Sequence, residues 1–407
     1  MVREKLNQKF RYLLNFLFED PKKFVRIVVL SVCCVVVIFQ LTECFRKLIR
    51  PPVSTHFRFE LNDTMVYPAI TLCRDPPYKY EVLRRFNLTL HPKYANAFDM
   101  FNFNESSLEE LFREATYNED EFFIAYALNQ DPENIKTTPN MHLNLGNCFT
   151  LDPLVTTSHT WRDAGYSIFL QHDSDDDYSD QLEDVPGWHV FIHDRAEGFA
   201  ENRAQSSGRV EYLFLEVNEQ IEVKMTAQHL HMLPSENLCT TVLEMSSTRC
   251  SELCHWRHVV NIAGCTGPWM PDIEQRTCST SNETQQLIKH YQLLESLDSS
   301  VCGCYQPCTA VIYTTFVMNR KRFNISVPAG HIWLYYTSKM VTFVEEFHGY
   351  DLAQFVADMG GSLGFLLGLS VLGLIGLIGK ITEILCLRNL IPEEEITEKQ
   401  CEAKNSQ

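Results

Sequence analysis

The chain has 407 residues, which is enough for two or three ordinary domains, and it carries a net charge of −17 at pH 7. This charge excludes nucleic acid as a partner, because binding nucleic acid requires a concentrated positive surface. Neither H-E-x-x-H nor G-x-S-x-G occurs in the chain, so we expect no enzyme of those two classes and no cofactor.

The first hydrophobic run, Val25 to Phe45, is long enough to cross a bilayer. No small-residue cleavage site follows it, so it predicts a first transmembrane helix at 25–45 rather than a cleaved signal peptide. Basic residues precede or enter the run, as expected of a cytoplasmic amino terminus at 1–24. These residues are Arg3, Lys5, Lys9, Arg11, Lys22, Lys23 and Arg26.

Glycosylation sequons indicate which side of the membrane the middle of the chain occupies. Every N-x-Ser/Thr triplet lies between the two hydrophobic runs. The acceptor residues are Asn62, Asn87, Asn104, Asn282 and Asn324. We therefore predict an extracellular domain at 46–350, a second transmembrane helix at 351–387, and a cytoplasmic tail at 388–407.

The cysteines agree with an extracellular middle. Of 15, five lie in or near the membrane segments and tails, namely Cys33, Cys34, Cys44, Cys386 and Cys401. The other ten lie between Cys73 and Cys308, and an even number in an oxidising compartment predicts five disulfides. A zinc site stays open as a less favoured alternative, because the cysteine-rich part at 239–308 contains Cys250-x3-Cys254 and Cys302-Gly-Cys304-x3-Cys308.

Local patterns predict mixed secondary structure in the first half of the extracellular domain. Pro51 and Pro52 end the first helix, and Tyr67 to Cys73 has the pattern of a strand. Apolar spacing from Ser107 to about Leu128 predicts a helix that opens with a Ser107/Glu110 capping box and bends near Tyr117-Asn118.

The second half of the domain is predicted in the same way. Asp173 to Asp184 is crowded with acidic residues, and a solvated loop is favoured there over a proton or divalent-cation sensor. The periodicity of Glu283 to about Leu297 predicts a helix. The aromatic and β-branched run from Ile332 to Phe347 predicts a strand that leads almost directly into the second membrane segment.

The second membrane segment is glycine-rich. Gly360, Gly364 and Gly368 recur every four residues, and Gly373, Gly376 and Gly379 every three. Small residues on one face let helices approach closely in lipid, so we expect packing against other helices. A packing face with no further role is the simpler alternative. The tripeptide Gly368-Leu369-Ser370 offers carbonyls and a hydroxyl, the groups that replace the water shell of a cation in a pore.

Four motifs in chain order resemble those of the degenerin, epithelial sodium channel and acid-sensing ion channel family, with an invertebrate-type subunit as the best fit. They are Tyr67-Pro68-Ala69-Ile70-Thr71-Leu72-Cys73, then Gly146-Asn147-Cys148-Phe149-Thr150, which is a turn in that family, then the strand Gly187 to Asp194, and finally Asp358 to Phe365 followed by Gly368-Leu369-Ser370. The resemblance covers roughly residues 22–387.

The resemblance implies an α+β membrane protein with two transmembrane helices flanking a disulfide-rich extracellular domain. It implies a homo- or heterotrimeric, amiloride-sensitive cation channel of the plasma membrane that is gated through this domain and prefers sodium. Both termini would be cytoplasmic and the helices would contact lipid. Gly368, Leu369 and Ser370 would form the selectivity filter, and Ala357, Asp358 and Gly361 the gate. The implied disulfides are Cys73–Cys148, Cys239–Cys308, Cys250–Cys304, Cys254–Cys302 and Cys265–Cys278.

The sequence departs from the family pattern in three places. Lys9-Phe10 lies near where a His-Gly dipeptide is expected, and no Trp precedes Cys239. Gly376 and Gly379 replace acidic residues in the inner half of the second helix, which leaves fewer fixed negative charges at the inner mouth. A weakly selective channel is therefore a further possibility, and the alternative function is a non-conducting or modulatory subunit whose extracellular domain binds a partner.

Overall fold

The computed structural model describes residues 21–172, 185–201, 209–234, 239–241, 246–293, 302–323 and 327–368, together with Gly373, 375–376, 379–380 and Thr382. The chain divides into two compact units, one formed by Met1–Ser54 with His348–Gln407 and the other by Thr55–Phe347. The first unit contains both predicted membrane segments, and the second contains nearly all of the predicted extracellular domain. The two are named after these predictions as the membrane unit and the extracellular unit.

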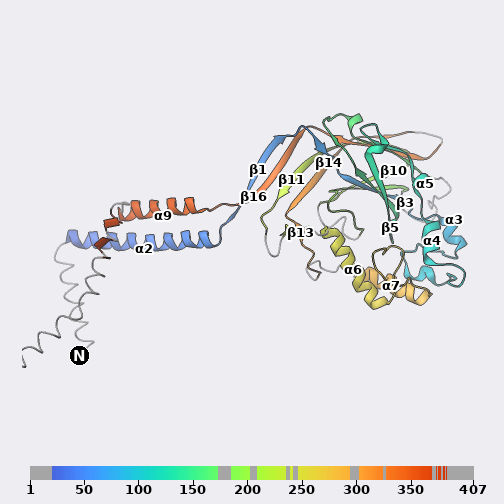
Figure 1. Ribbon diagram of the computed structural model, residues 1–407, viewed down its shortest axis with the longest axis horizontal. Helices are drawn as coiled ribbons and strands as arrows, with labels where there is room; N and C mark the ends of the chain where they lie inside the picture. Colours follow the sequence, from blue (N-terminus) through green and yellow to red (C-terminus); the bar gives the residue numbers. More distant parts are fainter. Residues whose placement is uncertain are drawn as a thin grey trace, which may run out of the picture. The chain divides into compact units, whose positions relative to one another are not determined.

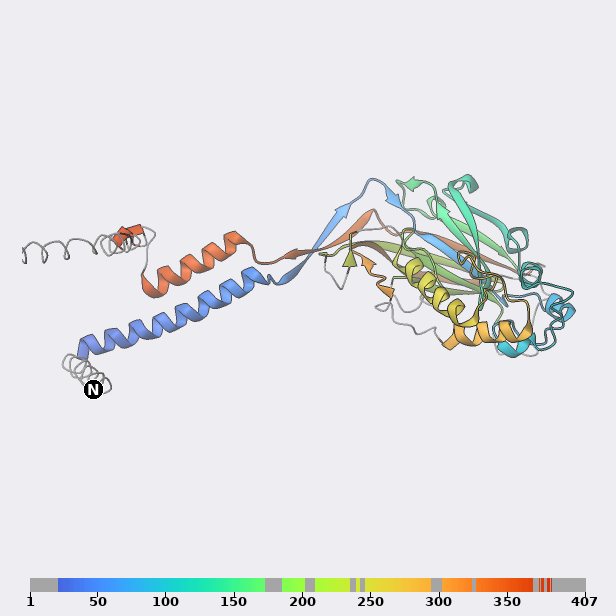
Figure 2. The same cartoon turned by 60° about the horizontal axis from the view of Figure 1, so that its bottom comes forward.

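The membrane unit contains α2 (Pro21–Ile49) and α9 (Leu352–Leu367), which lie side by side in Figures 1 and 2. Among the described residues, only Ile27–Ile49 is long and apolar enough to span a membrane as one helix. The predicted helix at 25–45 is therefore present and continues to Ile49, because helix-breaking residues first occur at Pro51 and Pro52.

Helix α9 is shorter than the predicted segment 351–387, because both of its ends are capped. The Asp351 side chain accepts a hydrogen bond from the Gln354 backbone N–H at 2.7 Å, which starts the helix. Gly368 takes the left-handed conformation with φ 64°, and its N–H donates to the Leu363 carbonyl, which ends the helix. The helix predicted across 351–387 is thus interrupted at Gly368, and most of its second half lies outside the described residues.

The extracellular unit is built around two sheets (Figure 1). The larger sheet has the strand order β1-β16-β11-β15-β8-β4, with β14 pairing β11 as a seventh strand, and the smaller has the order β10-β9-β3-β6-β5. The larger consists of β1 (Val53–Leu61), β16 (Met340–His348), β11 (Glu219–His231), β15 (Ala329–Tyr336), β8 (Tyr166–Gln171), β4 (Phe123–Leu128) and β14 (Thr309–Arg322). The smaller consists of β10 (Glu211–Glu216), β9 (Gly187–His193), β3 (Ala69–Asp75), β6 (Gly146–Pro153) and β5 (Ile135–His142).

Two short strand pairs and several helices complete the unit. The pairs are β2 (Met65–Val66) with β7 (Thr156–Thr157), and β12 (Cys239–Thr240) with β13 (Gln306–Pro307). The α-helices are α3 (Tyr80–Arg85), α4 (Leu108–Ala115), α5 (Glu119–Phe122), α6 (Ser247–Ala263) and α7 (Ser281–Leu293). The 3-10 helices are η1 (Ala95–Phe98), η2 (Pro132–Asn134) and η3 (Arg162–Ala164).

Separate hydrophobic cores stabilise the sheets and the helices. The first core lies where the two sheets face each other, and it includes Tyr67, Phe149 and Trp188 from the smaller sheet side and Tyr166 and Leu334 from the larger. The second core joins α4, α6, α7 and η1 and includes Phe112, Trp256, Trp269 and Leu287. The cysteine-rich helices therefore pack, together with α4 and η1, into a core separate from that of the sheets.

The helix predicted from Ser107 to Leu128 is wrong in its second half. The chain forms α4 and α5 and then the strand β4, whose residues Phe123 to Leu128 pair antiparallel with β8. The Ser107 side chain accepts from the Glu110 N–H at 3.2 Å, but the reciprocal capping box occurs at Asn118 and Glu121. Strand pairing with a distant segment overrides the helical spacing of Phe122 and Phe123.

The other sequence predictions are confirmed or corrected strand by strand. The strand at Gly187–Asp194 is confirmed as β9, and the predicted turn at Gly146 is mainly the strand β6, with only Gly146 itself at a positive φ of 68°. The single strand predicted at Ile332–Phe347 is wrong, since β15 and β16 each pair parallel with a different part of β11.

The predicted helix at Glu283–Leu297 is α7 as far as Leu293, and the acidic run Asp173–Asp184 lies outside the described residues.

Candidate functional site

The predicted gate and filter residues occupy α9 and its carboxyl end. Ala357, Asp358 and Gly361 lie on the helix, and Gly368 lies directly after it. Leu369 and Ser370 fall outside the described residues. The site therefore combines one helix face with one helix terminus.

Bulky and small residues lie on opposite faces of α9. Phe355 is buried and Met359 half-buried in a cluster with Cys44 and Leu48 of α2, and the Phe355 ring centroid lies 5.0 Å from that of Phe45. A helix has 3.6 residues per turn, so Ala357, Gly361 and Gly368 share the face turned away from α2. The contact between α2 and α9 thus uses large side chains, not the glycine face.

The glycine face is open. A Cβ atom added at Gly360, Gly361 or Gly368 would meet no other atom within 4 Å, and Ala357 is exposed. The expectation that these glycines pack against another helix is therefore not met by α2 of the same chain. Small residues that face away from the partner helix leave room for a further helix or for water.

Helix α9 ends at a glycine inside the apolar segment. The last four carbonyls of any α-helix have no partner N–H in the helix. Gly368 bends the chain out of the helical path, which only glycine does at low cost with a positive φ. The last turn of α9 therefore directly precedes, along the chain, the tripeptide Gly368-Leu369-Ser370.

Asp358 does not share the small face with Ala357 and Gly361. The Tyr350 hydroxyl donates a hydrogen bond to Asp358 Oδ2 at 3.1 Å. The Lys47 ammonium lies 5.7 Å from the centroid of the Tyr350 ring, which is a favourable cation–π distance. Lys47, Tyr350 and Asp358 thus form a polar group where α9 begins, and the sequence did not point to it.

The extracellular unit contains five disulfides. They join Cys73 to Cys148, Cys239 to Cys308, Cys250 to Cys304, Cys254 to Cys302, and Cys265 to Cys278, as the family resemblance implies. All ten sulfur atoms are used in these bonds, which removes them as zinc ligands. Three of the bonds are nested and fasten β12 and α6 to the segment Cys302–Cys308.

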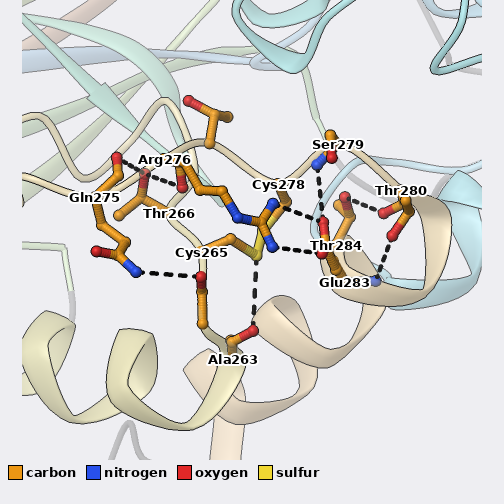
Figure 3. The surroundings of a disulfide bond; sticks show 12 residues. Ala263, Cys265, Thr266, Gln275, Arg276, Cys278, Ser279, Thr280, Glu283 and Thr284 are labelled. Carbon is orange, nitrogen blue, oxygen red and sulfur yellow. Dashed lines mark hydrogen bonds and ion pairs between the residues drawn. A yellow bond between two sulfur atoms is a disulfide. The ribbon is translucent and has the colours of Figure 1, made fainter.

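An ion pair stabilises the turn between α6 and α7. Figure 3 shows that Arg276 passes the Cys265–Cys278 disulfide and reaches Glu283 in the first turn of α7. Its guanidinium donates to the two carboxylate oxygens at 2.6 and 3.1 Å. The bonds from Arg276, and to a smaller extent one from the Ser279 N–H, lower the pKa of Glu283 to about 2.

A buried carboxylate connects the smaller sheet to the cysteine-rich helices. Glu197, which follows β9, is only 6% exposed. Its Oε2 accepts hydrogen bonds from the Ser247 hydroxyl at 3.0 Å and the Thr248 hydroxyl at 3.3 Å at the start of α6, while Arg209 lies 3.7 Å from Oε1. Nearby, Asp194 Oδ2 accepts from the Val311 N–H of β14 at 3.1 Å. Sequence analysis missed Glu197, since one Glu in a loop carries no local signal.

Three histidines that are buried or half-buried have lowered pKa values. Burial, with the charge of Arg249 adding to it, lowers the pKa of His142 to about 4. Burial, with Arg162 adding, lowers the pKa of His331 to about 4. Burial also lowers the pKa of His91 to about 3. These three side chains stay uncharged in mildly acidic solution.

Four of the predicted glycosylation sites are described. Asn87, Asn104 and Asn282 are exposed, and Asn62 is half-buried at the end of β1. Asn324 lies outside the described residues. All four belong to the extracellular unit.

One helix long and apolar enough to span a membrane, a large two-sheet domain and five disulfides are the features of a membrane protein with a disulfide-stabilised domain of extracellular type. The sequence model of the amiloride-sensitive sodium channel family matches residues 13–379, and the chain belongs to this family. Its members are ion channels of the plasma membrane that conduct cations and form oligomers.

Individual relatives are distant. The chain is 25% identical to degenerin mec-10 of Caenorhabditis briggsae over 38% of this chain and 25% of that protein. It is 25% identical to human acid-sensing ion channel 2 over 37% of this chain and 33% of that protein. The matches thus span a quarter to a third of the length of these relatives. A cryo-EM structure of a proton-activated chloride channel aligns over 88% of this chain and 96% of its own chain with 8% identity and a TM-score of 0.38, too low to support an argument.

Proposed function

We propose that this chain is a pore-forming subunit of a trimeric cation channel in the plasma membrane, with α9 lining the pore. The observation that carries the proposal is the end of α9 at Gly368, inside an apolar segment. Backbone oxygens released at membrane depth are tolerated only where they are buried in protein or line a water-filled cavity. Three copies around one axis would place the carbonyls of this turn, with Leu369 and Ser370, around the ion path as a selectivity filter.

The face of α9 that carries Ala357 and Gly361 supports a gate one level further out. Both residues are exposed and turned away from α2, so in a trimer this face would meet its symmetry copies. Asp358 would support the gate without facing the symmetry axis, because its hydrogen bond to Tyr350 holds the start of α9. Small side chains let three helices close tightly.

Gating through the extracellular domain follows from the connections of the chain. The chain passes between the two units along β1 and β16, which are neighbours in the larger sheet. The disulfides and Glu197 make the helical part of the domain stiff. We propose that ligand or force acting on this domain is transmitted through these two strands, with both termini in the cytoplasm.

Sodium preference and amiloride sensitivity are the finer parts of the proposal. They are supported by family membership, while Gly376, Gly379 and Lys380 at the inner mouth favour weak selectivity. The alternative is a modulatory subunit that does not conduct alone.

The test is whole-cell recording from cells with confirmed surface expression of Ala357→Val, a change that should open the channel. External sodium is replaced in turn by potassium and by a large organic cation, with and without amiloride. We expect a current carried by small monovalent cations, and a change of reversal potential when Gly368→Ala is added. A pore-forming role would be refuted if the variant reached the cell surface, carried no current alone, and did not increase the current of a related subunit expressed with it.

A further inference from the structure

Gln40 is a polar residue within the apolar span of α2. The α2 residues that are buried or half-buried on the side of α9 recur at helical spacing. They are Cys33, Val37, Gln40, Leu41, Cys44 and Leu48. Glu43 is half-buried as well, but its carboxylate pairs with Arg46 of the same helix at 2.7 Å. Apart from Gln40, the six are apolar residues or cysteines.

Gln40 is half-buried, and its amide oxygen is covered without a hydrogen bond. Its Oε1 is inaccessible to solvent and has no hydrogen-bond partner among the residues that the structure describes. Because the atom is already covered by its own chain, a neighbouring subunit reaches it only if α2 and α9 rearrange.

An unpaired amide is unfavourable in this environment. Inside a bilayer no water is available to satisfy it, and a buried polar group without a partner destabilises the arrangement that contains it. Any rearrangement that supplies a partner is favoured by the same amount. Gln40 therefore biases the α2–α9 pair away from the arrangement in this structure.

The nearest candidate partner follows from the geometry of the helix pair. Phe45 faces Phe355, and the Gly349 N–H donates to the Pro52 carbonyl where the two chain segments meet, so α2 and α9 run antiparallel. Gln40 precedes Phe45 by five residues on α2. Because the helices are antiparallel and rise equally per residue, Gln40 lies level with residues that follow Phe355 on α9, at about Gly360–Ser362. Ser362 is half-buried, follows Phe355 and Met359 on the same face, and has the only polar side chain of these three.

We propose that Gln40 is a polar latch between α2 and α9, which pairs with the Ser362 hydroxyl when the two helices shift, and that this structure shows the unlatched arrangement. The open space beside Gly360 and Gly361 leaves α9 room to move. The latch stands on the contact between two helices of one chain. Its effect on ion flow rests on the proposed function.

The test measures the population of the unlatched arrangement by cross-linking, which needs no current. The 407-residue chain in cell membranes keeps Cys44, carries Met359→Cys on the facing helix, and has Cys33, Cys34, Cys386 and Cys401 replaced by Ser. Cys44 and Met359 belong to one side-chain cluster in this structure. The initial rate of oxidative cross-linking is followed by mass spectrometry of the joined peptides.

Gln40→Leu removes the unpaired amide, so the cross-linking rate should rise about threefold or more. Ser362→Ala should raise it in the same direction, and the double variant should match Gln40→Leu alone, because the two residues act through one bond. Thr42→Val is the matched control, since the Thr42 hydroxyl bonds to the Phe39 carbonyl of its own helix at 2.7 Å and its loss should change nothing.

The latch would be overturned if Gln40→Leu left the cross-linking rate equal to that of the control or lowered it. It would also be overturned if the fold-changes of Gln40→Leu and Ser362→Ala multiplied in the double variant. Gln40→Met serves if Gln40→Leu does not reach the cell surface. Resting current is recorded separately. Cross-linking as expected in a chain that never conducts would support the latch while counting against the proposed pore.

Discussion

The Tyr350 hydroxyl donates to Asp358 Oδ2 at 3.1 Å and thereby ties the entry of α9 to its second turn. A hydrogen bond to a charged group contributes about 1.5–3 kcal/mol. Tyr350→Phe removes this bond and keeps the ring that packs with Cys44 and Phe355. In the Met359→Cys background, the rate of cross-linking to Cys44 should therefore fall, opposite in sign to the effect of Gln40→Leu. Asp358→Asn should lower the rate less, because its amide oxygen still accepts; a rise in either variant would contradict the role assigned to this bond.

Side-chain volume at position 357 should set the resting current. Overpacking a tight site costs about 1–3 kcal/mol, and about 1.4 kcal/mol changes a population tenfold. If Ala357 meets its copies in the closed state, resting current should rise from Ala357→Ser to Ala357→Val to Ala357→Trp. Val356 is exposed on another face and gives the control Val356→Leu. Currents that ignore volume at 357 would remove it from the gate.

Glu197 should contribute measurably to the stability of the extracellular unit. Glu197→Gln loses the charge that holds the start of α6 and the nearby Arg209, and we expect a loss of about 1–3 kcal/mol. Thermal unfolding of the purified protein should shift down by several degrees, whereas Glu274→Gln, at an exposed carboxylate, should leave it unchanged. Equal shifts in both variants would show that the buried carboxylate has no special role.

Buried His142 predicts a definite pH dependence of stability. Its pKa is about 4 in the folded protein and about 6.5 when unfolded. The unfolded state therefore binds more protons, so stability is full above pH 6.5 and is lost as the pH falls towards 4, by roughly 3 kcal/mol for this group.

His142→Phe should flatten the fall in unfolding temperature between pH 6.5 and 4, because it removes a titrating ring of similar shape. The His142 Nε2 has no hydrogen-bond partner among the described residues, so the change breaks no bond. His56→Gln, at an exposed site on β1, is the control. An unchanged pH profile in His142→Phe would mean that other groups dominate the acid loss.

The sequons give a direct check of topology. Exposed Asn87 and Asn104 should carry glycan if the domain is extracellular. An amide-cleaving glycosidase should increase gel mobility, and Asn87→Gln and Asn104→Gln should each remove one step of that shift. A protein from animal cells that shows no shift would place the domain on the wrong side of the membrane.

Sequence alone determined the features that depend on local composition. The apolar run at Val25–Phe45 predicts its own helix. Ala69–Cys73 of the first motif lies in strand β3, and Gly187–His193 of the third forms strand β9. The resemblance supplied the same five cysteine pairs that the structure forms, which spacing by itself leaves open.

Only the tertiary structure decided features that depend on distant partners. Phe123–Leu128 is a strand because β8 lies beside it, and β15 and β16 separate because each pairs with its own part of β11. The packing of Phe355 on α2 turns the glycine face outward, and the Gln40 Oε1 has no hydrogen-bond partner among the described residues. Glu197 gained its role from α6, fifty residues later. Such contacts are invisible to a local pattern, since their free energy comes from burial and bonding between segments that meet only in the folded chain.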